Sequence, residues 1–174
     1  MRFSPADPSE LPVIAALVNS AYRGESSRQG WTTEADYLGG QRTDAQTLAR
    51  DLAADPQAVV MTLRDEPDGP LLGCVWLEPT EGGAWYLGML TVRPDLQDRQ
   101  LGRTMLAAAE AHVRELGALR VRMTVIQIRD TLIAWYERRG YARTGETRPF
   151  PYADARFGRP ARDDLEFIVL EKAL

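Results

Sequence analysis

The sequence is poor in three residue types that often carry chemistry, because its 174 residues include one cysteine, one histidine and one lysine. A single cysteine, Cys74, excludes an internal disulfide and a cysteine-based metal cluster. It lies in the apolar run Leu72 to Trp76, which favours a buried, unreactive thiol. His112 has neither cysteine nor clustered carboxylates near it in the sequence, so we expect no metal site.

Long apolar runs are also missing. No stretch approaches the length needed to cross a bilayer, and residues 1–5 show no start of an apolar signal region. We therefore expect a cytoplasmic protein with no membrane partner. A composition of 44% hydrophobic and 26% charged residues excludes a disordered, collagen-like or disulfide-rich chain. Without internal repeats or low-complexity linkers, the chain is predicted to form a single domain over residues 1–174.

The charge is distributed unevenly along the chain. The net charge is −4, and 20 of the 21 basic residues are arginines. Residues 1–92 carry a net −7, residues 93–162 carry +6 and residues 163–174 carry −3. A basic middle segment in an acidic chain indicates a local anion site, whereas a nucleic-acid-binding domain would be basic overall. We expect no nucleic-acid partner, and the acidic first part would suit a cationic amine.

Local signals divide the first half into helices followed by strands. Capping residues and apolar spacing predict helices over residues 7–22 and 43–55 and a short helical piece over residues 32–40. Apolar runs separated by short turns predict an antiparallel meander. Its strands cover residues 58–63, 71–77 and 84–92.

The second half alternates between helix and strand. Apolar spacing predicts a helix from Leu101 to Leu116, then a strand over 119–126 and a short helix over 132–139. An irregular stretch, 148–164, precedes a last strand over 165–170. The order predicts a mixed α/β fold. A right-handed crossover from residue 84 to 119 makes two strands parallel, and a ligand-binding crevice opens where such strands diverge.

Residues 87–103 form the most informative segment, in which a strand runs through a polar turn into a helix. Free N–H groups and the positive end of the helix dipole suit a pyrophosphate at such a place. Gly102 lies in the first helical turn, and Arg99 and Arg103 add positive charge. From these residues alone, an ordinary connection with surface arginines is equally acceptable.

This segment resembles the acetyl-CoA signature of the GNAT superfamily of N-acetyltransferases, in which Gln or Arg is followed by two residues, Gly, one residue, and Gly or Ala. Gln97 and Gly102 match, while Gln100 stands where the first Gly is usual. A second resemblance lies in residues 132–141, a helix that ends in Tyr136 and Glu137 and is followed, after two residues, by Gly140 and the aromatic Tyr141. The order of elements fits along the whole chain.

The resemblance implies a GNAT fold, which is a mostly antiparallel sheet of about six to seven strands, flanked by helices and split at a central parallel pair. It implies acetyl-CoA as acetyl donor, direct attack by a primary amine in a ternary complex, and no metal. The cofactor's pantetheine arm would pair with the backbone of Leu90, Thr91 and Val92. Its pyrophosphate would rest on the turn formed by Gln97, Asp98, Arg99, Gln100, Leu101, Gly102 and Arg103.

By the same resemblance, Tyr136 is the general acid that protonates the leaving thiolate, and a phenol is protonated at neutral pH. Without the resemblance, Tyr136 would also fit as an aromatic side chain of the hydrophobic core. Many relatives carry a carboxylate on the central strand as general base, but Gly88 and Met89 occupy that place here. The candidates that remain for the base are Glu78, Glu25 and Glu34.

Acceptor specificity is expected from segments outside the two cofactor motifs, since long polar connections often carry function. The candidate acceptor-binding residues are Tyr22, Glu25, Trp31, Trp76, Tyr86 and Tyr152. The acceptor would be a small-molecule or peptide amine, and a homodimer stays open. A rival hypothesis is a non-catalytic acyl-CoA-binding sensor or regulatory module, favoured by Gln100 and the missing strand carboxylate but opposed by Tyr136.

Overall fold

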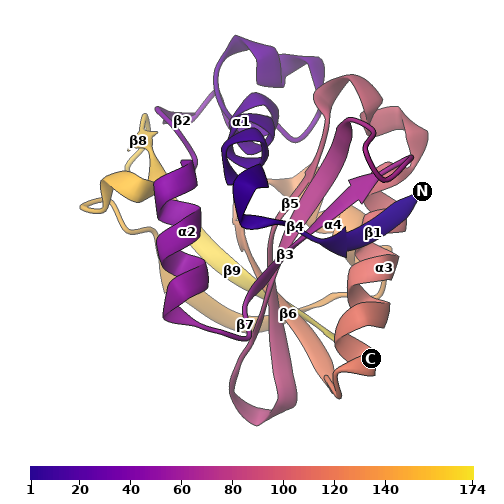
Figure 1. The fold of residues 1–174 in the computed structure, drawn as a ribbon. Helices are drawn as coiled ribbons and strands as arrows, with labels where there is room; N and C mark the ends of the chain where they lie inside the picture. The colour runs from indigo at the N-terminus through magenta and orange to yellow at the C-terminus, as the bar shows by residue number, and fades with distance from the viewer.

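A computed structural model describes residues 1–174 and arranges them around a seven-stranded sheet (Figure 1). The strands in order across this sheet are β1 (Arg2–Pro5), β3 (Val59–Arg64), β4 (Leu71–Pro79), β5 (Ala84–Val92), β6 (Arg120–Ile126), β9 (Glu166–Ala173) and β7 (Ala142–Pro149). A separate two-stranded ribbon pairs β2 (Leu38–Gly39) with β8 (Arg159–Pro160). The helices are α1 (Leu11–Tyr22), α2 (Ala45–Ala54), α3 (Leu101–Glu115) and α4 (Asp130–Glu137).

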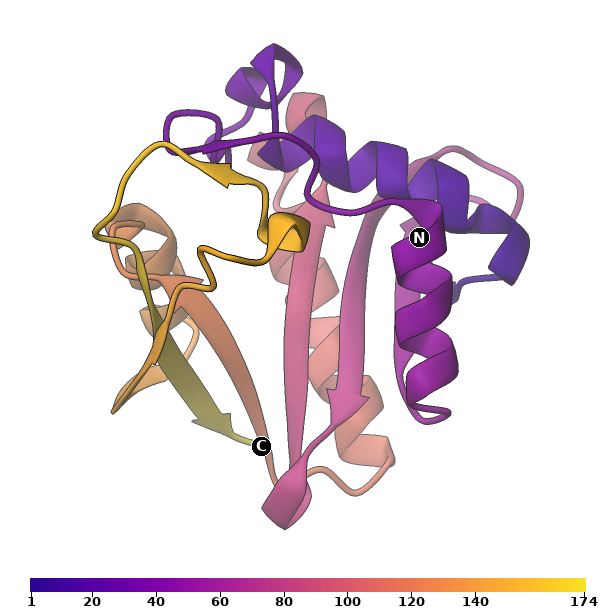
Figure 2. The same cartoon turned by 90° about the vertical axis from the view of Figure 1, so that its left-hand side faces the viewer.

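The predicted parallel pair is confirmed at the centre of the sheet. β5 and β6 are parallel neighbours over a short register, from Ala84 opposite Arg120 to Tyr86 opposite Arg122, and every other pair in the sheet is antiparallel. Beyond Tyr86 the two strands diverge, as the pink β5 and orange β6 show in Figure 2. The edge of β5 from Leu87 onward therefore has no strand partner on the β6 side.

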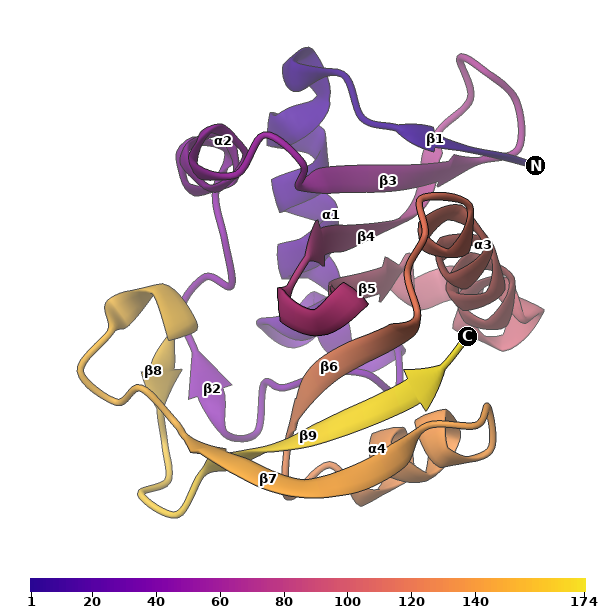
Figure 3. The same cartoon turned by 90° about the horizontal axis from the view of Figure 1, so that it is seen from below.

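Helices cover both faces of the sheet because strand side chains alternate between the faces. On β3, Val60 packs in a cluster with α1 and α2, whereas Met61 packs in the larger cluster that contains α3 and α4. Figure 3 shows α1 and α3 on opposite sides of the β3 to β5 strands. The predicted mixed fold is confirmed. None of its helices is long and apolar enough to cross a membrane.

The predicted helical piece over residues 32–40 is wrong. These residues form turns and the short strand β2, and a 3-10 turn at Glu25–Gln29 precedes them. The Thr33 hydroxyl accepts a hydrogen bond from Ala35 N, and Glu34 N donates to Tyr22 O. Because side-chain and long-range acceptors take these donors, the local helical signal does not prevail.

The irregular stretch predicted over residues 148–164 is also more ordered than expected. β7 extends to Pro149, and the segment closes through β8 onto β2. The ribbon places residues 150–160 beside the connection that follows α1, far away in sequence.

Candidate active site

A β-bulge interrupts β5 where it leaves β6. Gly88 lies opposite Trp76 and Thr91 lies opposite Cys74, so two residues of β5 face one residue of β4. One of the two, Met89, has a φ of 54°, in the left-handed region that non-glycine residues rarely adopt. The other, Leu90, turns its carbonyl oxygen to accept a hydrogen bond from the Tyr22 hydroxyl. The bulge thus fixes the Leu90 backbone at the point where the strands separate.

Two cavities meet at this point, and we name them the cofactor-side cavity and the acceptor-side cavity after the roles predicted from the sequence for the residues that line them. The cofactor-side cavity has a volume of about 340 Å³ and extends from Leu90 and Val92 to the start of α3. The acceptor-side cavity is smaller, about 100 Å³, and lies among β5, β6 and the segment after α1. Both cavities are lined by Tyr22, Leu90, Arg129, Leu132 and Tyr136.

The start of α3 presents unpaired N–H groups to the cofactor-side cavity. No backbone acceptor takes the N–H groups of residues 100–103, as is usual in the first helical turn. Gln100 itself has a φ of 60°, a conformation that glycine adopts without strain, and it occupies the place of a glycine in the motif that the sequence resembles. A Cβ added to Gly102 would meet nothing closer than the Trp135 ring at 3.6 Å, so the backbone there is open to a close ligand.

The other predicted cofactor residues are divided between the cavity and the core. Those that line the cavity are Leu90, Val92, Gln97, Asp98, Gln100, Gly102 and Arg103. Thr91 and Leu101 are buried, and Arg99 is exposed outside the cavity. The Gln97 side chain accepts from Trp31 N at 2.9 Å and donates to the Thr32 hydroxyl at 2.8 Å. Gln97 therefore holds the preceding loop against the start of α3.

Trp31 was expected on the acceptor side, but it lines the cofactor-side cavity. Its ring lies 6.2 Å from that of Trp135. This position follows from the two hydrogen bonds of Gln97, which draw residues 31 and 32 toward α3.

The basic middle of the chain contributes arginines to the cofactor side. Arg139 stacks on Trp135, with its guanidinium carbon 3.6 Å from the ring centroid, and lines the cavity together with Arg103. Both also line an adjoining groove with Arg138 and Lys172. Sequence patterns do not single out Trp135, Arg139 and Arg129 as site residues, although the net +6 of residues 93–162 indicates this part of the chain.

Tyr136 lies at the junction of the two cavities. Its side chain is buried against the rings of Trp135 and Tyr141, at centroid distances of 5.0 and 5.6 Å. Its hydroxyl has no hydrogen-bond partner in the protein. Burial raises the pKa of Tyr136, and the neighbouring Tyr22 raises it further. The hydroxyl is therefore protonated at neutral pH and free to donate.

A buried ion cluster forms the wall of the acceptor-side cavity. Glu34 is bonded to Arg23 through one carboxylate oxygen and to Arg129 through the other, at 3.0 Å in the second case. Arg42 approaches the same carboxylate at 3.5 Å. Burial favours a higher pKa for Glu34, but the nearby arginines outweigh it and hold the pKa below its ordinary value. A buried carboxylate with a lowered pKa is a poor general base.

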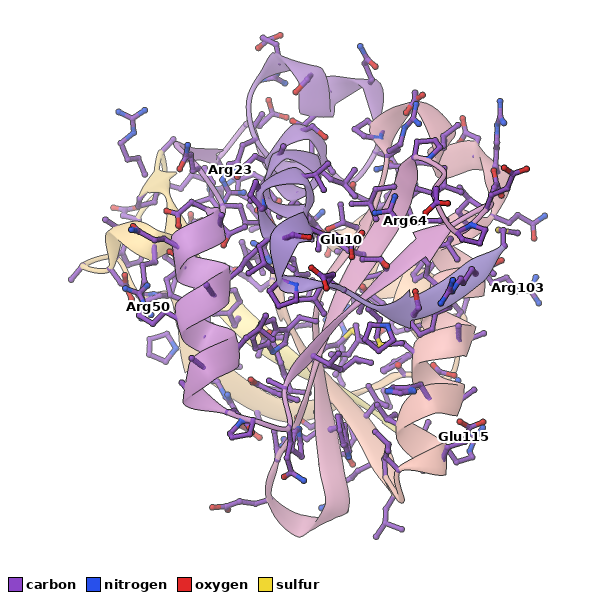
Figure 4. The ribbon with its side chains drawn as sticks, viewed as in Figure 1. Glu10, Arg23, Arg50, Arg64, Arg103 and Glu115 are labelled. Carbon is purple, nitrogen blue, oxygen red and sulfur yellow. The ribbon has the colours of Figure 1, made fainter.

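The acidic residues of the first part of the chain predict negative charge on the acceptor side, but this cluster makes the charge there positive. The charged residues that line the acceptor-side cavity are Arg23, Glu34, Arg42 and Arg129, which leaves an excess of positive charge. Most carboxylates of residues 1–92 lie elsewhere, on the surface. Figure 4 shows Arg23 near β8, well away from Arg103 at α3, so the two arginine groups belong to different sides of the site.

The remaining candidates lie at the outer part of the acceptor side. Tyr86 lines the acceptor-side cavity and shares a 3.2 Å hydrogen bond with Thr124. Trp76 donates to Glu78 at 3.0 Å, and both line an outer groove of about 510 Å³ that also includes Arg42 and Tyr86. No group of three or more His, Cys, Asp or Glu side chains is placed to hold a metal ion.

Two further candidates, Glu25 and Tyr152, line neither of the two cavities nor the outer groove. The Glu25 side chain is 90% exposed and pairs with Arg28. The Tyr152 hydroxyl accepts a hydrogen bond from Leu165 N at 2.6 Å and packs beside Phe150. Neither side chain lines the point where the cavities meet.

The split sheet thus has a helix N-terminus and one cavity on one side and a second cavity on the other, and the two cavities share Leu90 and Tyr136. Residues 14–141 match the acetyltransferase (GNAT) family, and the chain belongs to this family. The resemblance seen in the sequence is thereby confirmed, and the protein is an enzyme of the acyltransferase class.

Solved structures share the fold at low sequence identity. An IAA acetyltransferase from Bacillus cereus superposes with a TM-score of 0.67 at 13% identity, covering 99% of each chain. A ribosomal-protein-alanine N-acetyltransferase from Brucella melitensis gives 0.69 at 18% identity, covering 100% of each chain. A GNAT acetyltransferase from Elizabethkingia anophelis with acetyl-CoA bound gives 0.61 at 14%, covering 73% of this chain and 82% of that one. No curated protein matches the sequence.

Proposed function

We propose that this protein transfers the acetyl group of acetyl-CoA to a primary amine by direct attack in a ternary complex. The observation that carries the proposal is the meeting of two cavities at Leu90 and Tyr136. Reactants that enter from opposite sides of the split sheet would be held in contact there, which lowers the entropic part of the barrier.

The cofactor-side cavity fits the chemistry of coenzyme A. The unpaired N–H groups of residues 100–103 suit a pyrophosphate, and Arg103 and Arg139 supply the matching charge. The edge of β5 from Leu90 to Val92 has no strand partner on the β6 side, so the peptide groups of this edge other than the Leu90 carbonyl, which accepts from Tyr22, are available to the amides of the pantetheine arm. Acetyl-CoA, when bound, supplies the acetyl group as a reactive thioester.

Tyr136 would hold the proton that the leaving sulfur requires. Tyr136 lines both cavities, and its hydroxyl has no competing partner and stays protonated because burial raises its pKa. As the amine nitrogen forms the amide bond and the carbon–sulfur bond breaks, the amine loses one proton and the sulfur gains one from Tyr136. Return of the amine's proton to the tyrosine restores the starting state.

The acceptor amine must first lose the proton of its ammonium form. Excess positive charge in the acceptor-side cavity favours the neutral amine, because like charges lower the pKa of a cationic group. Glu34 is held by its arginines, so we propose that the proton leaves by water toward the outer groove, where Glu78 lies.

Replacing Tyr136 by phenylalanine tests this role. We expect turnover to fall by roughly a hundredfold or more, the usual contribution of a positioned acid. Acetyl-CoA affinity, measured by isothermal titration, should stay nearly unchanged. Tyr37→Phe is the matched control, since it also removes a hydroxyl without a hydrogen-bond partner but lies outside both cavities.

Three results would contradict parts of the proposal. Absence of acetyl-CoA binding at millimolar concentration would remove the cofactor. Unchanged turnover in Tyr136→Phe would reduce Tyr136 to a packing residue. Binding of acetyl-CoA without release of free thiol in the presence of any amine would favour a sensor or regulatory module instead.

A further inference from the structure

The three arginines around Glu34 are not equally engaged. Arg23 donates to Glu34 and to the carbonyl of Phe157 at 3.3 Å, and Arg129 donates to Glu34 and to the carbonyl of Thr32 at 2.6 Å. The guanidinium of Arg42 makes no hydrogen bond to the protein, and its approach to Glu34 is a 3.5 Å ion pair. Its fork of donors is therefore open to another acceptor.

Arg42 is held in place without using those donors. Its guanidinium carbon lies 4.6 Å from the centroid of the Tyr22 ring, within the range of a cation–π contact. The side chain is 31% exposed and lines both the acceptor-side cavity and the outer groove. Arg42 is thus positioned beside Tyr22, one of the residues that separate the two cavities, and can be reached from solvent.

A second unsatisfied donor belongs to the same wall. Arg23 has a side chain that is only 4% exposed, and its Nε has no hydrogen-bond partner. Buried polar groups are normally paired, so an orphan donor on a cavity wall points to a missing acceptor. Since Glu34 already bonds Arg23 and Arg129, its carboxylate cannot also satisfy every donor around it.

From this cluster we propose that the acceptor is a small amino acid-type molecule, whose carboxylate binds the guanidinium of Arg42 while its amine points to Tyr136 and Leu90. The inference rests on the proposed function and names its acceptor class. A carboxylate matches the planar fork of arginine with two parallel hydrogen bonds. It would also offset part of the excess positive charge, which is costly to keep away from water.

The size and charge of the acceptor side support a compact zwitterion. The acceptor-side cavity of about 100 Å³ has room for roughly seven to ten groups of the size of a water molecule, which fits an amine and a carboxylate that lie close together. The outer groove has room for a side chain and is mixed in charge, because it is lined by Asp51, Asp55 and Glu78 as well as by Arg23, Arg42 and Arg156. A polyamine would instead place several positive charges against three arginines.

A panel of matched acceptors tests the proposal. Standard amino acids are compared with their carboxamides, which keep the amine and side chain but lose the negative charge, and spermidine serves as the polycation. Free thiol release is followed with acetyl-CoA as donor. We expect at least one amino acid to exceed its carboxamide in kcat/KM by roughly ten- to a hundredfold, the usual effect of a hydrogen bond to a charged group. Equal or better turnover of the carboxamides or of spermidine overturns the inference and leaves the proposed function intact.

Substitution of Arg42 tests whether its guanidinium causes the preference for an amino acid over its carboxamide. Arg42→Gln should lower kcat/KM for the amino acid much more than for its carboxamide, mainly through KM, and so abolish the preference for the amino acid. Arg28→Gln is the control, because it removes one positive charge from the same segment at an exposed ion pair outside the cavities. If Arg42→Gln does not fold, Arg42→Lys keeps the charge without the fork and should show a reduced preference. A preference that is unchanged in a folded Arg42 variant overturns the assignment.

Absence of transfer to every amine in the panel is a different result. It would overturn the proposed function, and with it this inference, whereas loss of preference with transfer intact affects the inference alone. Acetyl-CoA binding by titration, measured in the same samples, shows in each case whether the cofactor side is competent.

Discussion

Replacing Glu34 by glutamine removes the one negative charge from the buried arginine cluster. The Glu34 and Arg23 side chains are 3% and 4% exposed, and Arg129 is 10% exposed, so neither arginine can turn to solvent without local unfolding. Breaking a buried ion pair by neutralising one partner costs about 3–5 kcal/mol, because an uncompensated charge remains in the interior. Arg42 adds little to this cost, since it is partly exposed already.

The expected loss of stability for Glu34→Gln is therefore about 3–5 kcal/mol at pH 7. For a chain of this size it corresponds to a fall in Tm of roughly 6–20 °C. Urea unfolding measures it directly through the midpoint and slope. Glu25→Gln is the control, because that side chain is 90% exposed and its ion pair should contribute almost nothing.

We also expect Glu34→Gln to change how the stability of the protein depends on pH. Burial opposes ionisation of Glu34, but its arginine neighbours lower the pKa below the ordinary value of 4.5. Stability from the carboxylate is thus fully present above pH 4.5 and is lost as pH falls through the lower pKa of the folded state. The gap between wild type and Glu34→Gln should narrow on acidification. A gap under about 1 kcal/mol at pH 7, or one that does not narrow, would refute this account of the cluster.

Two further predictions concern the start of α3 and the single cysteine. Gln100→Gly should stabilise the protein by about 1 kcal/mol in urea unfolding, because glycine adopts a φ of 60° without strain. Gln100→Ala should keep the strain, so equal effects of the two changes would contradict this explanation. Cys74 is fully buried, and burial raises its pKa to about 12, so the native thiol should not react with an aromatic disulfide reagent at pH 8 and should react at once in urea. Rapid reaction of the native protein would show that this strand opens readily.

Local sequence signals predicted most of the helices and strands. The capping residues before α1 and α2 and the apolar spacing of α3 depend only on neighbours along the chain, and the structure has these helices close to the predicted limits. Local signals predicted a helix at Glu34 that the structure does not have, because the Glu34 N–H and carboxylate make hydrogen bonds to residues distant in sequence. The cofactor motif also did not predict a second role of Gln97, whose side chain makes hydrogen bonds to Trp31 and Thr32 in the preceding loop.

The sequence by itself determined the mixed fold and the family, because these follow from periodicity and from motifs contained in single strand–turn–helix segments. Only the tertiary structure decided the character of the acceptor side. Arg23, Glu34 and Arg42 come from the segment after α1, whereas Arg129 comes from the start of α4, 95 residues beyond Glu34. Coulomb interactions depend on distance in space, so a segment with net negative charge forms a cavity in which positive charge prevails.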